Sequence, residues 1–212
     1  MSGYEVTRFG ELEAIPVAEG LVWHPVRRRL GITAFGINAY SAEEVGGHVV
    51  ERHTEEQLGH EEVYVVVSGR ARFVLGDDVV DAPSGTMIFL RDPAVQREAT
   101  AEEPGTLVLA VGGKPGAPYE TSAWETLFYA LPAVREERWD EAITLHEEAL
   151  REQPDHPRLL YNLACVESLG GRHDEALLHL QQAIRLDRRL ADRAENDADL
   201  DAIRGLAGFP IP

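Results

Sequence analysis

The sequence contains a single cysteine and has no long apolar run. One cysteine, Cys165, cannot form an intramolecular disulfide and excludes every Cys-x-x-Cys metal or redox motif. Its setting, Asn-Leu-Ala-Cys-Val, predicts a packing residue in the core of a helix. Nowhere do 18 apolar residues follow one another, and the N-terminus has no apolar segment typical of a signal peptide. We therefore expect a soluble, cytoplasmic protein with no membrane partner.

Basic residues are also few, since 20 Lys and Arg stand against 37 Asp and Glu and give a net charge of −17. Such a chain repels phosphate backbones, so the composition predicts no nucleic-acid partner. A phosphate loop, a Rossmann glycine pattern and a Ser-His-Asp set are all lacking in a suitable context. The catalytic classes that depend on these motifs therefore have no support.

Two kinds of pattern divide the chain. Residues 1–111 contain short β-branched and aromatic runs that Gly, Pro and Asp turns separate, which indicates an antiparallel sandwich or barrel. Residues 112–122 are rich in Gly and Pro and predict a linker. Residues 123–212 change to a helical period. The predicted fold class is thus an α+β multidomain chain, with a β-barrel followed by an all-α domain.

The helical part contains an internal repeat. Residues 138–142, Arg-Trp-Asp-Glu-Ala, superpose on residues 172–176, Arg-His-Asp-Glu-Ala, at an offset of 34. This period, and small residues where paired helices approach, resemble the tetratricopeptide (TPR) repeat. About two repeats cover residues 123–190, and the acidic segment that follows resembles a capping helix. Two interpretations stay open: the helices pack on the barrel or a second subunit, or their surface binds a protein partner.

Ligand-type side chains concentrate between Gly47 and Gly69, just before a run that predicts a buried strand, residues 63–67. His53 and Glu55 are two apart, so they share one face of an extended chain. With six residues between Glu62 and Gly69, this spacing resembles the first motif of the cupin superfamily. Glu55 replaces the second histidine of that motif, and the loop before the glutamate is longer.

The second cupin motif has its counterpart in residues 81–92, which keep the frame Pro83-x-Gly85. Ile88 stands where the motif has a histidine, and Asp92 where it has an asparagine. The resemblance implies an antiparallel double-sheet jelly roll whose mouth commonly holds a small molecule or a metal. Cupins include oxygenases, isomerases, decarboxylases and sugar-binding regulators, so the fold leaves the function open.

A hairpin would compensate for the histidine lost at Ile88. If residues 47–55 and 60–68 pair around the loop 56–59, Glu55 faces His60 and His53 faces Glu62 on one side of the sheet. Two imidazoles and two carboxylates suit a divalent ion such as Zn, Mn, Fe or Ni. A register slip of one residue would instead leave His60 and Glu55 at the surface of a metal-free barrel.

The alternation of side chains between the two faces of a strand also predicts the residues that line the cavity. Tyr64 and Val66 continue inward from Glu62, and Ile88 makes the opposite wall apolar. Tyr64 serves as a core aromatic or as a ligand contact. Arg97, which follows the second motif, pairs with a ligand carboxylate or forms a structural ion pair. These four residues are the predicted small-molecule contacts.

Three classes of function follow. The first is a module whose barrel binds a small molecule, with or without a metal, and whose TPR-like region contacts a partner. The second is a metal-dependent enzyme of the oxygenase or isomerase class, and the third is a structural interaction protein with an inactive barrel. The residues at 55 and 88 favour the first class, because two histidines of the motif are replaced. The edges of a jelly-roll sheet also predict a homodimer through the barrel.

Overall fold

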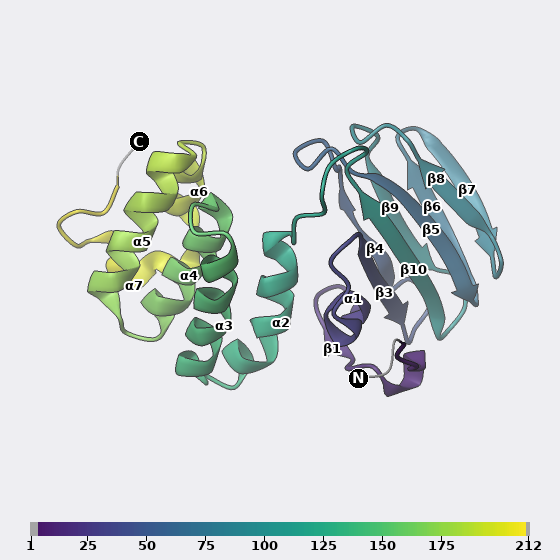
Figure 1. The fold of residues 1–212 in the computed structure, drawn as a ribbon, viewed down its shortest axis with the longest axis horizontal. Coiled ribbons are helices and arrows are strands. Elements are labelled where there is room, and N and C mark those ends of the chain that lie inside the picture. The colour runs from purple at the N-terminus through teal and green to yellow at the C-terminus, as the bar shows by residue number, and fades with distance from the viewer. Residues whose placement is uncertain (1–3, 211–212) are drawn as a thin grey trace. The chain divides into compact units, whose positions relative to one another are not determined.

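The computed structural model describes residues 4–210 of the chain. These residues form two compact units, which are divided between Thr121 and Ser122. The first unit consists mainly of strands and the second of helices, as Figure 1 shows. The predicted fold class, an antiparallel barrel followed by an all-α region, is confirmed.

The barrel unit is built from two antiparallel sheets. The six-stranded sheet has the order β1-β2-β3-β10-β5-β8 and the four-stranded sheet the order β4-β9-β6-β7. The strands of the first sheet are β1 (Ile15–Pro16), β2 (Val22–His24), β3 (Gly36–Ala42), β10 (Thr106–Gly113), β5 (Glu61–Ser68) and β8 (Met87–Leu90). Those of the second are β4 (His48–His53), β9 (Arg97–Ala101), β6 (Arg70–Leu75) and β7 (Asp78–Pro83).

The core of this unit lies between the two sheets. Because side chains alternate along a strand, every second residue points into the space that the sheets enclose. Tyr64 and Val66 of β5 point inward together with Val108 of β10, and they pack with Phe73 and Ala99 of the other sheet. The run of β-branched residues at 63–67 therefore forms the buried strand that it predicts, with alternate residues on the core face.

The predicted hairpin between residues 47–55 and 60–68 is wrong. Strand β4 pairs with β9, where His53 lies opposite Arg97. Strand β5 pairs with β10 and β8, so β4 and β5 belong to different sheets. Residues 54–60 carry the chain from one sheet to the other, and Gly59 takes a positive φ of 70° in the turn. Two further departures from the all-strand pattern are the short helix α1 (Val26–Leu30) and the turn η1 (Phe9–Glu11).

Strand β10 extends beyond the predicted barrel boundary at residue 111. Gly112 lies opposite Gly36 of β3 and Glu62 of β5, so it continues the ladder on both sides. Its lack of a side chain is required there, because a Cβ at this position would lie 2.9 Å from Cγ of Glu62. The glycine that suggested a linker is thus part of the sheet, while the domain boundaries 1–111, 112–122 and 123–212 stay a prediction.

The helical unit contains α2 (Ala123–Arg135), α3 (Trp139–Glu152), α4 (Pro157–Leu169) and α5 (His173–Leu186). Helices α3 and α5 begin at Trp139 and His173, which are 34 residues apart, as the repeat predicts. Ala142 and Ala176, at equivalent positions, are fully buried. The predicted capping helix is instead divided into α6 (Leu190–Asn196), the turn η2 (Ala198–Leu200) and α7 (Asp201–Arg204).

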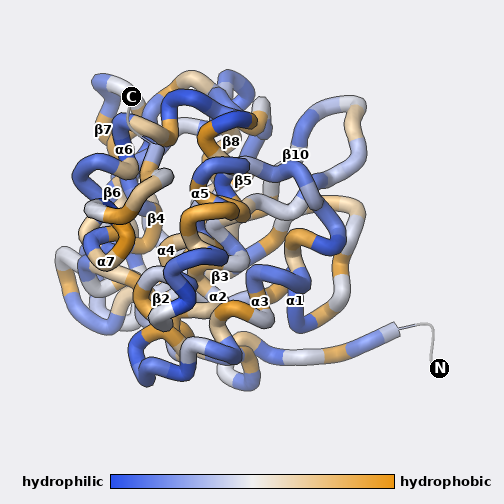
Figure 2. The backbone as a smooth tube through the Cα atoms, turned by 90° about the vertical axis from the view of Figure 1, so that its left-hand side faces the viewer, coloured by the Kyte–Doolittle hydropathy of each residue, from blue (hydrophilic) through white to orange (hydrophobic). Residues whose placement is uncertain are grey.

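The helices alternate between hydrophobic and hydrophilic residues along their length (Figure 2). Cys165 of α4 is buried in the core that α4 and α5 share, as its sequence setting predicts. Burial and the neighbouring Asp197 raise the pKa of its thiol, so Cys165 stays protonated and acts as a packing residue. Within residues 4–210, none of the helices combines the length and the apolar character that a membrane span requires.

The stability of the helical unit is expected to fall on acidification. His146 of α3 is fully buried, and its Nδ1 donates to the carbonyl of Ala142 at 2.9 Å. Burial lowers its pKa, so the folded state binds a proton less readily than the unfolded state. The neutral ring of His146 therefore stabilises the fold above the ordinary imidazole pKa of about 6.5. This contribution is lost as the pH falls through the lowered pKa of His146 in the folded state. H146F should flatten this dependence, measured as denaturant unfolding of the full chain followed by helical circular dichroism.

His179 provides a control of opposite sign. Its Nδ1 lies 2.7 Å from Oε2 of Glu167, and this hydrogen bond raises the pKa of His179. The contact therefore stabilises the fold below pH 6.5 or so and loses that effect as the pH rises through the raised pKa. H179Q should make the loss on acidification steeper, whereas equal pH profiles for H146F and wild type would contradict the role of His146.

Candidate functional site

Four ligand-type residues lie where the chain passes from one sheet to the other. His53 ends β4, Glu62 is the second residue of β5, and Glu55 and His60 stand at the two ends of the loop between them. The backbone of Glu55 fixes this loop. Its amide donates to the carbonyl of Pro93 at 2.9 Å, and its carbonyl accepts from the amide of Gly59 at 2.7 Å. The positions of the side chains are thus set by short backbone contacts.

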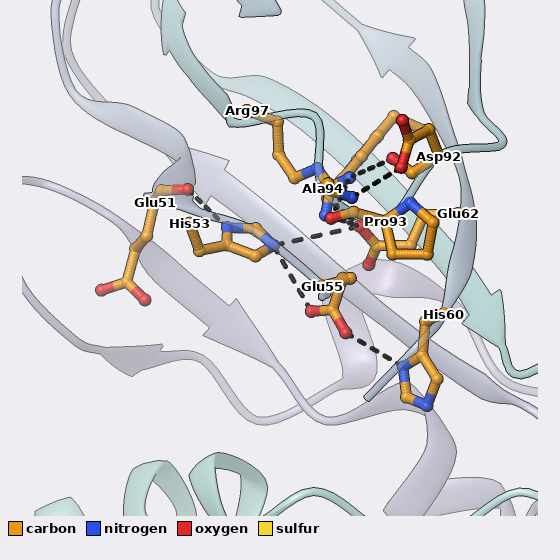
Figure 3. Close-up of polar contacts among 10 residues, drawn as sticks. Glu51, His53, Glu55, His60, Glu62, Asp92, Pro93, Ala94 and Arg97 are labelled. Atoms are coloured by element: carbon orange, nitrogen blue, oxygen red, sulfur yellow. Dashed lines mark hydrogen bonds and ion pairs between the residues drawn. The ribbon is translucent and has the colours of Figure 1, made fainter. Parts of the chain in front are cut away.

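The side chains of His53, Glu55 and Glu62 come together, and His60 contacts the other oxygen of Glu55 (Figure 3). Nε2 of His53 lies 3.6 Å from Oε1 of Glu55 and 3.9 Å from Oε2 of Glu62. Nδ1 of His60 lies 3.2 Å from Oε2 of Glu55. The structure therefore contains both pairs that the hairpin predicted, but His53 and Glu62 come from different sheets and Glu55 and His60 from one loop. His60 does not join the other three at a common point.

The orientation of His53 leaves one ring nitrogen available. Its Nδ1 lies 2.7 Å from the carbonyl oxygen of Glu51, which can only accept, so Nδ1 carries the proton of the neutral ring. Nε2 then presents a lone pair toward Glu55 and Glu62. A lone pair that faces two carboxylates is a repulsive arrangement unless a proton or a cation lies between them.

Burial changes the acidity of Glu62. Desolvation, and next the charge of Glu55, raise the pKa of Glu62, whereas a hydrogen bond from Tyr64 and the charges of His53 and Arg97 act against this. The hydroxyl of Tyr64 donates to Oε2 of Glu62 at 2.6 Å. Burial raises the pKa of Tyr64 well above its usual value, so the hydroxyl remains a donor. Tyr64 therefore serves both the core and the site.

Arg97 lies at the same place in the barrel and is fully buried. Its Nη1 is 3.5 Å from Oε2 of Glu62, and its Nη2 lies 3.5 Å from the carbonyl oxygens of Asp92 and Pro93. The sequence left two roles open for this residue, and the ion pair with Glu62 is present. Nε and Nη1 of Arg97 have no hydrogen-bond partner among the described residues.

Val66 and Ile88 extend the site into the apolar core. Val66 is buried on the same face of β5 as Tyr64, and Ile88 of β8 lies opposite Tyr64. Ile88 packs against the core from a partly buried position. It offers no atom that could hold a metal. Its place in the wall of a ligand cavity stays a prediction from the sequence.

Two contributors to the site were missed by the sequence analysis. One is the backbone carbonyl of Glu51, which orients His53 and which no side-chain pattern can reveal. The other is Tyr119, whose ring stacks on His60 with a centroid distance of 5.8 Å. Tyr119 lies in a Gly- and Pro-rich stretch with no periodicity, so no pattern in the sequence indicates its contact with His60.

The family model of the tetratricopeptide repeat matches residues 126–189. Several solved structures resemble the barrel region. KdgF from Halomonas sp. has 15% identity and a TM-score of 0.41, and the match covers 53% of this chain and 91% of that one. A cupin protein from Bacteroides fragilis has 17% identity and a TM-score of 0.40, over 57% and 93% of the two chains. An RmlC-like cupin from Shewanella frigidimarina has 13% identity and a TM-score of 0.40, over 54% and 95%. No curated protein matches the chain.

The chain joins a barrel of two antiparallel sheets to a helical region that matches the tetratricopeptide repeat model. The barrel carries a group of residues able to hold a metal ion, His53, Glu55 and Glu62.

Proposed function

We propose that the barrel is a small-molecule-binding module that holds a divalent metal ion through His53, Glu55 and Glu62. One observation carries this proposal: a nitrogen of His53 and a carboxylate oxygen of each glutamate all lie within 4.8 Å of one another. Imidazole and carboxylate ligands together suit Zn, Mn, Fe or Ni. His60, which the sequence also suggested as a ligand, contacts Glu55 at 3.2 Å, and we assign it the role of orienting that carboxylate.

The contacts of His53 fit a shared ion. Ligand atoms bind such an ion at about 2.1 Å, so two of them lie at most about 4.2 Å apart. The distances of 3.6 and 3.9 Å from Nε2 to the carboxylates are within this limit and are long for direct hydrogen bonds. A bound ion would supply a Lewis acid at the mouth of the barrel. Tyr64, Val66, Ile88 and Arg97 would then line the space for a small molecule.

A second candidate is a module that binds its small molecule without a metal. The observation that favours it is the fully buried guanidinium of Arg97, whose Nη1 is 3.5 Å from Glu62. This cation already compensates the charge of one of the two carboxylates. In that case His53 and the glutamates form a polar wall, and Arg97 recognises an acidic group of the ligand.

Thermal unfolding with added metal distinguishes the two candidates. Full-length protein without an affinity tag is stripped with EDTA, and Zn, Mn, Fe, Ni or Co is added at neutral pH. An ion that binds only the folded state should stabilise the barrel by about 2.7 kcal/mol at a hundredfold excess over its dissociation constant. The gain should shrink toward pH 5, because an imidazole ligand must be neutral and because the pKa of Glu62 is raised by burial.

Variants of this experiment test the ligands. H53A and E62Q should abolish the gain. H48A is the matched control, because His48 begins the same strand and pairs instead with Glu19 at 3.1 Å. If no ion moves the melting temperature of the wild type, the metal proposal fails and the metal-free module is left.

The helical unit has a role of its own in the proposal. Its two repeats favour contact with a protein partner or with a second subunit, since stacked helical repeats present extended surfaces. Homodimerisation through the barrel, cytoplasmic location and the lack of a nucleic-acid partner stay predictions from the sequence. Strand β8, at the edge of its sheet, exposes Met87 and Phe89, and this supports a contact between copies.

A further inference from the structure

Tyr119 lies in the segment that follows β10, and its ring contacts His60 and the guanidinium of Arg27. The ring stacks on His60 with an interplanar angle of 30° and a centroid distance of 5.8 Å. The guanidinium carbon of Arg27 lies 5.7 Å from the centroid of the same ring. A stacked imidazole and a cation above the ring hold its orientation more firmly than either contact alone.

A gap in the side chains of the sheet makes room for this ring. A Cβ at Gly36 would lie 2.8, 2.9 and 3.0 Å from three atoms of the Tyr119 ring and hydroxyl. Such distances are closer than van der Waals contact, so any larger residue at position 36 would push the ring away. The glycine is thus required by a close approach and not by its backbone angles.

Strand register shows which face of the sheet the ring occupies. Gly36 lies opposite Gly112, and Gly112 lies opposite Glu62, so the three positions share one face. Tyr64, two residues beyond Glu62, is buried between the sheets, which identifies this face as the inner one. The ring of Tyr119 therefore lies on the same inner face as Glu62, beside the candidate metal ligands.

These contacts form a continuous series. Tyr119 stacks on His60, and Nδ1 of His60 lies 3.2 Å from Oε2 of Glu55. Oε1 of Glu55 in turn lies 3.6 Å from Nε2 of His53. His60 is buried, so its orientation depends on the groups that surround it.

We propose that Tyr119 is a positioning residue of the site: its ring holds His60 against Glu55 and thereby sets the orientation of that carboxylate. The inference rests on the proposed metal function for its effect on affinity. It extends that function, because it makes the segment between β10 (Thr106–Gly113) and α2 (Ala123–Arg135) a part of the site.

The first measurement is calorimetric titration of EDTA-stripped, full-length protein with Zn(II). Y119A should weaken binding by about tenfold or more, since partners of metal ligands typically contribute 10–100-fold to affinity. Y119F keeps the ring and should stay within about threefold of the wild type on the same scale. G36A should weaken binding as Y119A does, because the added Cβ displaces the ring. G113A is the matched control, because a Cβ at Gly113 meets nothing within 4 Å.

A double-mutant cycle tests the route through His60. Because Tyr119 acts by holding His60, Y119A should have no further effect in an H60A background. Additive losses in Y119A/H60A, or equal affinities for Y119A and wild type, would overturn the proposal.

The second measurement needs no metal. Ring protons of His60 should move in the NMR spectrum of stripped protein when Y119A or G36A removes the stacked ring, and they should not move in G113A. Unchanged His60 signals would overturn the positioning role directly. If the wild type binds no ion, the titration contradicts the proposed metal function, and the NMR result still decides whether Tyr119 positions His60.

Discussion

Replacing Arg97 with methionine is expected to destabilise the barrel by about 3–5 kcal/mol at neutral pH, the usual cost of removing one partner of a buried ion pair. Arg97 is fully buried, and its Nη1 lies 3.5 Å from Oε2 of Glu62. Without it, Glu62 retains a charge that burial and the nearby Glu55 already disfavour. The measurement is the free energy of unfolding of stripped full-length protein in urea, followed by a signal from the barrel.

The pH dependence and a second substitution identify the cause. Glu62, whose pKa is raised, takes up a proton more readily than an ordinary glutamate, so the loss in R97M should become smaller as the pH falls. R97M/E62Q should recover part of the loss, because the orphaned charge is gone.

R52M is the control on the neighbouring strand. Arg52 is 67% exposed and lies 4.0 Å from Glu98, and an exposed pair of this kind contributes about 0–1 kcal/mol. If R97M costs no more than R52M, the buried pair does not stabilise the barrel, and the charge of Glu62 needs no buried cation beside it.

Replacing Gly69 with alanine is expected to cost about 2–5 kcal/mol, the sum of a left-handed backbone and a steric clash. Gly69 has a φ of 72° in the turn between β5 and β6. A Cβ there would lie 2.9 Å from Cα of Thr106 and still closer to its hydroxyl oxygen. That hydroxyl accepts from the amide of Arg70 at 3.2 Å and lies 2.6 Å from the carbonyl of Glu103.

Gly76 supplies the comparison that separates the two costs. It has a φ of 60°, and a Cβ there would meet nothing within 4 Å, so G76A should lose only the backbone term of about 1–2 kcal/mol. Urea unfolding of both variants measures the difference. Equal losses in G69A and G76A would mean that Thr106 moves aside without cost, and that the closing glycine of the motif is needed for its φ alone.

Local patterns in the sequence predicted much of the fold. The run at 63–67 formed an inward-facing strand because β-branched and aromatic residues suit a buried pleated surface, and Gly69 ended it where φ turns positive. The offset of 34 between the two Asp-Glu-Ala segments gave the helix starts at Trp139 and His173. These signals lie within one element or one repeat, so a single sequence reveals them.

Strand pairing was the part that the sequence could not reveal. The short loop after Glu55 suggested a hairpin, yet β4 pairs with β9, which lies far along the chain. Residues that face each other across two sheets give the same side-chain contacts as residues side by side in one sheet, so His53 and Glu62 approach in either case. Tyr119 comes from a distant segment, so its place depends on that pairing and leaves no local pattern.

Two missing side chains, at Gly36 and Gly112, create the space that Tyr119 and Glu62 occupy. Both glycines also pair with each other in the ladder between β3 and β10, which needs only their backbone groups. Alanine at Gly36 would keep the backbone groups of that ladder, while its Cβ would take the place of the Tyr119 ring. Glycine and alanine codons differ by one base. A single point mutation is therefore sufficient to disrupt the site while the pairing of the strands remains.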